Sequence, residues 1–344
     1  VNRMMAFMFP IMMIIMNLTS LAIMWFGAKR IDAGAMEMGA LAAFLQYAMQ
    51  IMFSFLMLSM MFIMVPRAQA AAVRINEVLE TEPEINDPQL AKPAAGGRGR
   101  VEFRDVTFSY HGAEQPALSN ISFTAEPGEI VSIIGGTGSG KSTLINLIPR
   151  FYDVDSGAVL VDGVDVRDIT QSELRGKIGF VPQKSVLFSG SIAENIRFGK
   201  EDATDTEISD AAATAQATEF ISQTEEGYEH MIAQGGTNVS GGQKQRLSIA
   251  RALVKKPEVY LFDDSFSALD FKTDAKLRAA LKKQTADSTV FIISQRVSTV
   301  MDSDKIIVLD EGRIVGLGRH RDLVRTCSVY REIAASQLSE EQLA

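Results

Sequence analysis

The chain has 344 residues, a formal net charge of −8 at pH 7 and a single cysteine. This length allows two or three units of ordinary domain size. A protein that binds the phosphates of a nucleic acid needs a concentrated basic face. The sequence shows none, so we expect no nucleic-acid partner. The lone Cys327 cannot form an internal disulfide, which fits a reducing compartment for the soluble part.

Two long apolar stretches open the chain, at about residues 4–26 and 39–65. Fifteen of the 17 methionines precede residue 65, and charges are few in this region. Each stretch is long enough to cross about 30 Å of hydrocarbon as a helix. With a polar link over 27–37 between them, they predict a transmembrane hairpin. Apolar spacing as far as Leu79 predicts that the second helix continues beyond the bilayer, so we assign residues 1–80 to a transmembrane part.

Two features of this part have more than one interpretation. Gln46 and Gln50 lie one turn apart, with Ser54 near them on the same helix face. They would either line a substrate cavity or form hydrogen bonds between helices. The methionines would either offer an adaptable surface to apolar ligands or simply pack and face lipid. The chain begins with Val1 and has no leader-cleavage pattern, which we interpret as the start of a truncated chain, and two helices alone cannot enclose a solute pathway.

Prolines and glycines over residues 81–100 predict a non-helical linker. After it, apolar runs typical of strands alternate with helical stretches, notably at 208–220 and 273–284. The first run, 101–110, has a slip in its alternation that predicts a bulge. This alternation predicts an α/β domain with a largely parallel central sheet over 101–344. The other predicted strands are 129–134, 158–161, 177–181, 258–262, 289–293 and 305–309.

The segment GGTGSGKST stands between a predicted strand and a predicted helix, the context that a phosphate-binding loop requires. Its glycines would let backbone N–H groups surround phosphate oxygens. Lys141 would reach the β- and γ-phosphates, and Ser142 would ligate Mg²⁺, so the sequence predicts ATP and Mg²⁺ as ligands. The predicted nucleotide-binding residues of this loop are Gly135, Gly136, Thr137, Gly138, Ser139, Gly140, Lys141, Ser142 and Thr143.

Two further motifs carry chemistry. In VYLFDD, Asp263 and Asp264 follow a buried strand at the edge where ligand sites of parallel sheets lie, and Asp263 suits the Mg²⁺ role. In VSGGQKQR, Ser240, Gly241 and Gly242 begin a helix whose exposed N–H groups form a second anion site. One nucleotide cannot easily bind both the phosphate-binding loop and this second helix N-terminus. We therefore expect the second anion site to bind an ATP held by another copy or another subunit.

These motifs, in this order over about residues 101–335, resemble the ATP-binding cassette (ABC) family. The resemblance implies a P-loop ATPase domain with a β subdomain and a helical subdomain. It also implies that the two apolar stretches are the last two of six helices in each half of an exporter, and that two cassettes hold two ATP molecules head to tail. By resemblance, Tyr110 stacks on adenine, Gln183 senses Mg²⁺, Gln243 completes the VSGGQ signature, and Ser267–Asp270 contacts the partner.

The chain departs from the family pattern at two positions. After the Mg²⁺ aspartate the family usually has a glutamate that acts on the attacking water, and this chain has Asp264. Where the family usually has a histidine that contacts the γ-phosphate, this chain has Gln295. Aspartate is one methylene shorter, and misplacement by over an ångström can cost about 10²-fold in rate. Glutamine cannot become cationic. We therefore expect the site of Asp264 and Gln295 to bind ATP but to hydrolyse it poorly, while the intact signature completes a partner's site.

The sequence thus predicts one subunit of a heterodimeric multidrug-type ABC exporter in a membrane. We expect a bacterial inner membrane, with the ATPase domain in the cytosol, where ATP is available. The expected partners are a second ABC subunit, lipid and a solute that the sequence does not identify. The alternatives are a homodimer that uses Asp264 as the base, a membrane ATPase that does not transport, such as a regulated channel, and a soluble mechanical ATPase, which the two spans disfavour.

Overall fold

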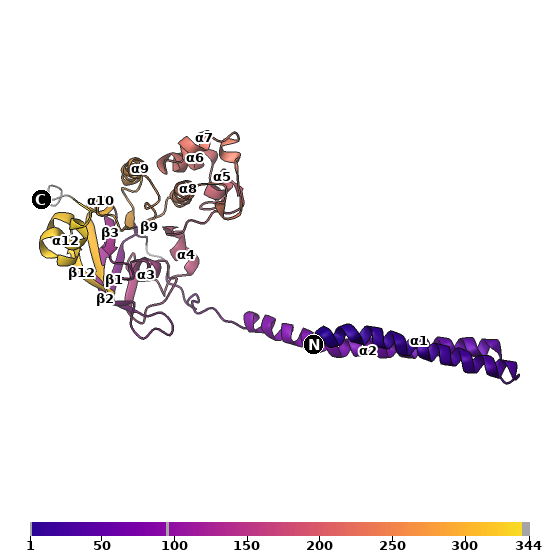
Figure 1. Cartoon of the computed structure of the whole chain (residues 1–344). Coiled ribbons are helices and arrows are strands. Elements are labelled where there is room, and N and C mark those ends of the chain that lie inside the picture. The colour runs from indigo at the N-terminus through magenta and orange to yellow at the C-terminus, as the bar shows by residue number, and fades with distance from the viewer. Residues whose placement is uncertain (1, 94–95, 339–344) are drawn as a thin grey trace. The chain divides into compact units, whose positions relative to one another are not determined.

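The computed structural model describes residues 2–93 and 96–338. The chain forms two compact units, Val1–Glu84 and Ile85–Ala344 (Figure 1). The first contains two long helices, and the second contains all of the strands that the structure describes.

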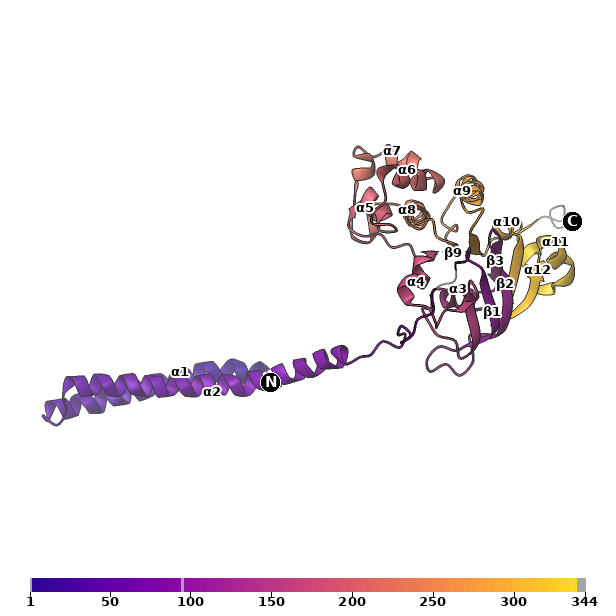
Figure 2. The same ribbon diagram turned by 180° about the vertical axis from the view of Figure 1, so that it is seen from behind.

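The first unit is a helical hairpin of α1 (Asn2–Asp32) and α2 (Met38–Leu79), which lie side by side in Figures 1 and 2. Both helices are long and apolar enough to cross a membrane. The buried Gly27 lets them approach, since a Cβ there would collide with the Leu41 side chain. The predicted helical hairpin is therefore confirmed.

The link between the two helices is shorter than predicted. The expected polar link covered 27–37, but α1 continues to Asp32. Lys29 and Arg30 lie in its last turn, where cations interact favourably with the negative end of the helix dipole. Beyond the end of the helix lies Gly34, whose φ of +67° is typical of a glycine that terminates a helix.

The second unit contains three sheets: a four-stranded sheet in the order β2-β1-β4-β5, a six-stranded sheet in the order β12-β11-β3-β10-β9-β6, and the pair β7-β8. In the six-stranded sheet, all neighbouring pairs are parallel except β11-β12, which confirms the predicted α/β class. The strands are β1 (Val101–Phe108), β2 (Leu118–Ala125), β3 (Ile130–Gly135), β4 (Ser156–Val161), β5 (Val164–Asp165), β6 (Ile178–Val181), β7 (Gly190–Ser191), β8 (Met231–Ile232), β9 (Val259–Asp263), β10 (Thr289–Ile293), β11 (Lys305–Asp310) and β12 (Arg313–Gly318).

The helices of this unit cover the six-stranded sheet and build a separate helical part from α5 to α8 (Figure 1). They are α3 (Lys141–Leu147), α4 (Gln171–Gly176), α5 (Ile192–Arg197), α6 (Asp205–Thr214), α7 (Thr218–Ser222), α8 (Gly241–Val254), α9 (Phe271–Gln284), α10 (Val297–Val300), α11 (His320–Thr326) and α12 (Ser328–Ala335), with two 3₁₀ turns at Gly227–Glu229 and Gln234–Gly236.

Two details of the strand and helix predictions have clear outcomes. The predicted slip in the first strand is confirmed, because Asp105 has a φ of +46° and the β1-β2 register shifts there. The helical stretch predicted over 208–220 is helical on both sides of a break at residues 215–217. Gln216 adopts a φ of +56° between α6 and α7, and the N–H of Ala217 bonds the Ala212 carbonyl at 2.8 Å, which ends α6 in a Schellman-type cap.

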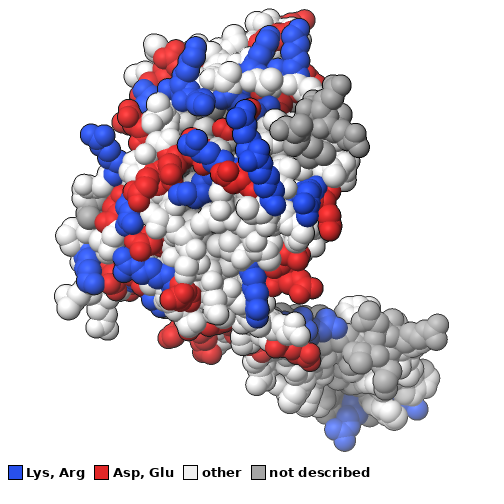
Figure 3. Space-filling view, turned by 90° about the vertical axis from the view of Figure 1, so that its left-hand side faces the viewer, with Lys and Arg blue, Asp and Glu red and all other residues white. Residues whose placement is uncertain are grey.

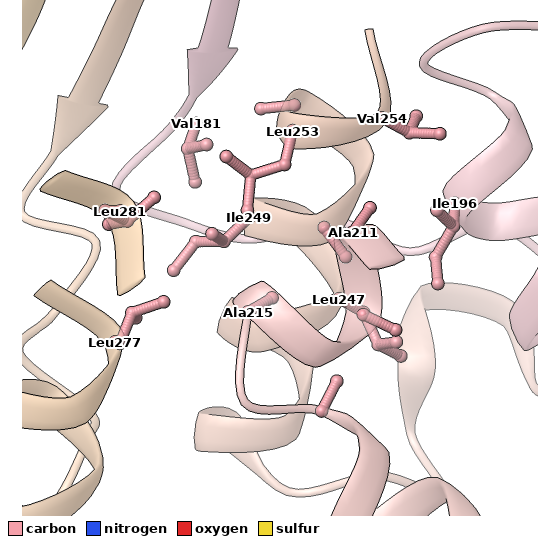
Figure 4. Close-up of a cluster of buried hydrophobic side chains, with 14 of the residues drawn as sticks. Val181, Ile196, Ala211, Ala215, Leu247, Ile249, Leu253, Val254, Leu277 and Leu281 are labelled. Atoms are coloured by element: carbon pink, nitrogen blue, oxygen red, sulfur yellow. The ribbon is translucent and has the colours of Figure 1, made fainter. Parts of the chain in front are cut away.

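Three clusters of buried side chains form the core of this unit. One lies between the two larger sheets and around α3. A second surrounds α8, where Figure 4 shows Ile249 between Leu281 of α9 and Ala211 of α6. A third packs α10, α11 and α12 on β11. Thus the helix after the phosphate loop and the signature helix α8 pack into different clusters.

Charges on the surface are mixed in sign. On the face shown in Figure 3, Lys and Arg side chains are interspersed with Asp and Glu side chains. The linker residues that follow Glu84 join this surface through polar contacts. Lys92, for example, donates to the Asp168 carboxylate at 2.6 Å, and the N–H of Gln171 donates to Asp87 at 2.8 Å.

Candidate ATP-binding site

The predicted phosphate-binding segment, Gly135–Thr143, begins at the last residue of β3 and ends in the first turn of α3. The loop between the strand and the helix covers residues 136–140. Gly140 caps α3 with a φ of +97°, and a Cβ there would lie 2.8 Å from Leu118 Cδ2. Only glycine fits this combination of conformation and close approach. The sequence therefore folds here into a tight turn whose backbone N–H groups precede a helix, the arrangement that binds phosphate.

Lys141 lies within this segment. Its Nζ donates to the carbonyl oxygens of Gly135 at 3.0 Å and Gly136 at 2.5 Å. Burial lowers the pKa of Lys141, and the charges of Asp264 and Asp263 oppose that shift. The loop thus holds an ammonium group close to both acidic residues of the predicted site.

Ser142 and Asp263 are brought together as predicted for a Mg²⁺ site. The Ser142 hydroxyl donates to Asp263 Oδ1 at 3.0 Å. Burial raises the pKa of Asp263, and the hydrogen bond from Ser142 opposes this shift. A hydroxyl and a carboxylate are ligands that Mg²⁺ prefers, alongside water and phosphate oxygens. Within residues 2–93 and 96–338, no group of three or more His, Cys, Asp or Glu is placed to hold a metal ion.

Asp264 follows β9 in a left-handed conformation, with a φ of +45°. Its backbone N–H bonds the Ile293 carbonyl at 3.1 Å, which ties the end of β9 to the end of β10. Burial raises the pKa of the Asp264 carboxyl. The charges of Arg296 and Lys141 and a hydrogen bond from Gln183 pull that pKa down. The structure therefore gathers Gln183, Lys141 and Asp264 at one place, at the carboxyl ends of parallel strands.

Tyr110 lies beside the phosphate-loop helix. Its hydroxyl is 3.0 Å from Thr143 Oγ1 on α3. Its ring meets Phe108 and Tyr152 edge-on, with centroids 5.0 and 5.4 Å away. With 40% of the residue exposed, the ring is both fixed and accessible. This arrangement is compatible with stacking on adenine, which stays a prediction.

Gln295 lies after β10 and is exposed. Its backbone carbonyl accepts a hydrogen bond from Gln337 Nε2 at 2.8 Å. The predicted contact of its side chain with a γ-phosphate stays a prediction.

The signature residues begin α8. Ser240 is the N-cap, and its hydroxyl accepts from the N–H of Gln243 at 3.3 Å, while the Gln243 side chain accepts from the N–H of Ser240 at 2.8 Å. This reciprocal capping box leaves the N–H groups of Gly241 and Gly242 at the exposed helix end. No hydrogen bond or ion pair in the described parts of the chain joins residues 240–243 to residues 135–143, and Figures 1 and 2 show α8 and α3 in different parts of the unit.

Sequence reasoning missed Arg296, which follows Gln295 directly. Its guanidinium donates to the Ser267 carbonyl at 2.8 Å, and its charge acts on Asp264. The only sequence signal was a cation next to a predicted contact residue. The sequence analysis also did not single out Ser265, which is fully buried. Its hydroxyl donates to the Val181 carbonyl at 3.0 Å, and this bond links the segment after β9 to the end of β6.

Comparison with known proteins agrees with this geometry. Residues 118–267 match the family model described as ABC transporter. The chain is 47% identical over 336 residues to an uncharacterized ABC transporter ATP-binding protein of Mycobacterium tuberculosis, covering 96% of this chain and 57% of that protein. It is 38% identical over 321 residues to the ATP-dependent lipid A-core flippase of Chromobacterium violaceum, covering 93% of this chain and 55% of that protein.

Among solved structures, a bacterial Atm1-family ABC exporter with ATP bound matches with a TM-score of 0.84 and 34% identity, over 98% of this chain and 60% of that chain. The chain thus has the fold of an Atm1-family exporter, with a helical transmembrane region followed by an ABC transporter nucleotide-binding domain. It spans between about 55% and 60% of the length of these relatives.

Proposed function

We propose that this chain is part of an ABC exporter subunit that couples ATP binding and hydrolysis to the export of a solute across a membrane. The observation that carries this proposal is the hydrogen bond of 3.0 Å between Ser142 and Asp263, beside Lys141 in the phosphate loop. The same chain contains a transmembrane hairpin, which supports a membrane role for the ATPase domain.

Each residue of the site has a role in this proposal. The loop Gly135–Thr143 binds the phosphates, and the Tyr110 ring stacks on the adenine. Ser142, Asp263 and Gln183 would hold Mg²⁺. When bound, the cation would supply positive charge against the phosphates.

We further propose that this site binds ATP but hydrolyses it slowly. The Asp264 carboxyl is one methylene shorter than glutamate, so it stands farther from an attacking water. Burial raises its pKa, which makes it hold a proton more readily, but it does not extend its reach. Gln295 can donate a hydrogen bond to a phosphate but cannot supply a positive charge.

The signature at Ser240–Gln243 would complete an ATP site whose phosphate loop belongs to a second ABC subunit. The separation of this end from the chain's own phosphate loop supports the arrangement, because both anion sites then have a nucleotide to bind. A heterodimer explains a degenerate phosphate-loop site next to an intact signature. We place the assembly in a bacterial inner membrane, with the ATPase domain in the cytosol.

One observation favours a homodimeric alternative. Asp264 is held in a defined position by the bond from its N–H to Ile293 and receives a hydrogen bond from Gln183. A fixed carboxylate with a raised pKa is suited to act as a general base. In that case, two identical slow sites would drive transport.

Steady-state ATP hydrolysis separates the two proposals. The full-length protein that carries this chain is expressed alone and with its candidate partner subunit, as wild type and as Asp264→Glu with Gln295→His. We expect the lone subunit to be nearly inactive, the pair to be active, and the double substitution to raise turnover by about tenfold or more. Lys141→Ala, which removes the phosphate-loop ammonium, is the background control for the subunit expressed alone. Brisk hydrolysis by the lone wild-type subunit would favour the homodimer that uses Asp264.

A further inference from the structure

A residue near the C-terminal end of the nucleotide-binding domain forms hydrogen bonds with the backbone of the segment that follows β10. Gln337, just beyond α12, donates from Nε2 to the Gln295 carbonyl at 2.8 Å and accepts at Oε1 from the Val297 N–H at 2.9 Å. A single planar amide therefore bonds the backbone on both sides of Arg296. The distance in sequence between the partners, 42 and 40 residues, means that only the tertiary fold brings them together.

Arg296, between these two anchors, reaches the loop that follows Asp264. Its Nη2 donates to the Ser267 carbonyl at 2.8 Å and its Nη1 to the Leu269 carbonyl at 3.4 Å. Its guanidinium also lies 5.4 Å from the centroid of the Phe271 ring. Any shift of the backbone at 296 would therefore move a group that touches this loop.

We propose that Gln337 is a positioning residue of the ATP site: it fixes the segment 295–297 so that Arg296 holds the loop Ser267–Asp270 in place. The kinetic consequence rests on the proposed function and on the contact of this loop with the partner subunit that the family resemblance implies. Gln337 is itself exposed and fills no part of the core, so its replacement removes the two hydrogen bonds without opening a cavity.

Hydrogen exchange of the full-length protein tests the contact directly. Gln337→Leu keeps a side chain of similar length but can neither donate nor accept. We expect amides in the segment 294–301 to exchange about fivefold faster, the factor that corresponds to one hydrogen bond of ordinary net strength. Amides of the loop 265–270 should also exchange faster, because Arg296 loses its fixed backbone.

Ser336→Ala is the matched control for this experiment. Ser336 is the neighbouring exposed residue, and its hydroxyl donates to the Ile333 carbonyl of its own helix at 2.7 Å. This variant should leave exchange in 294–301 unchanged. If Gln337→Leu exchanges there at the wild-type rate, or if Ser336→Ala accelerates exchange to the same extent, the proposed positioning role is wrong.

A kinetic cycle on the assembled pair tests whether the contact matters for the reaction. We expect Gln337→Leu to lower kcat for ATP by about threefold, with KM changed less than twofold, and Arg296→Ala to lower kcat further. The double variant should be no slower than Arg296→Ala, because Gln337 acts through that residue. Effects that multiply would contradict the proposal. A wild-type pair without ATP hydrolysis would overturn the proposed function instead, and the exchange rates would still decide the role of Gln337.

Discussion

At the scale of single residues, the site keeps charges where burial disfavours them. The Asp263 carboxyl is 6% exposed, and burial together with the neighbouring charge of Asp264 raises its pKa. A raised carboxyl pKa means that the folded protein binds this proton more tightly than the unfolded chain does. The ionised form therefore lowers the free energy of unfolding at neutral pH, a common property of functional sites.

This argument predicts that Asp263→Asn stabilises the nucleotide-free protein while it abolishes Mg²⁺-dependent ATP hydrolysis. The amide keeps a hydrogen bond with Ser142 and removes the buried charge. We expect a gain of about 1 kcal/mol at pH 7, seen as a higher midpoint of thermal unfolding. The destabilisation by the ionised carboxylate is complete above the folded-state pKa and disappears below the unfolded-state pKa. The difference in midpoint between variant and wild type should therefore shrink as the pH falls. A variant that is less stable than wild type at every pH would contradict this account.

The sequence predicted some of these residues better than others, for a physical reason. The phosphate loop and Asp263 follow from local spacing, because a strand, a glycine-rich turn and a helix leave one arrangement for their side chains. The bond from Arg296 to Ser267 joins positions 29 residues apart, and the bonds of Gln337 span 40 or more. Such contacts depend on how the elements pack, which no short pattern records.

At the scale of elements, the break between α6 and α7 shows the same limit. Neither Gly nor Pro marks it, yet Gln216 adopts a φ of +56° and closes a Schellman-type cap. The break has a structural use, because it turns the Gln216 carbonyl toward Arg246, which donates to it at 2.7 Å. The alanine-rich sequence of 208–220 runs across the break, so composition alone predicted a continuous helical stretch.

This conformation predicts that Gln216→Gly stabilises the domain by about 0.5–1 kcal/mol, because glycine adopts positive φ without strain. The bond from Arg246 is kept, since it is accepted by the backbone. Ala213→Gly, at an exposed position inside α6, is the matched control and should destabilise by about 1 kcal/mol. Thermal unfolding of the two variants measures both effects. Equal destabilisation by both would show that Gln216 bears no strain.

At the scale of the whole molecule, the chain presents two predicted phosphate-binding helix ends that belong to different parts of the nucleotide-binding domain. One, at α3, carries its own lysine and the predicted Mg²⁺ ligands. The other, at α8, has a closed capping box and Lys244 in its first turn, but none of the predicted Mg²⁺ ligands. Under the proposed function, a nucleotide that another subunit supplies completes this second end, so the activity of the assembly should depend unequally on the two ends of this chain.

Gly241→Asp tests this dependence in the assembled pair. A Cβ at Gly241 meets no heavy atom within 4 Å, and an acidic residue in the first turn favours a helix, so α8 should fold normally. The added carboxylate repels the phosphates of an ATP held by the partner, and we expect turnover to fall by about 10²-fold or more. Lys141→Ala impairs only this chain's own slow site and should lower turnover by less than about tenfold, since that site contributes little hydrolysis. Steady-state ATP hydrolysis of the pair measures both variants. Equal losses of turnover would mean that the two ATP sites work alike, as in a symmetric assembly. A much larger loss from Gly241→Asp is expected if this subunit mainly completes its partner's ATP site.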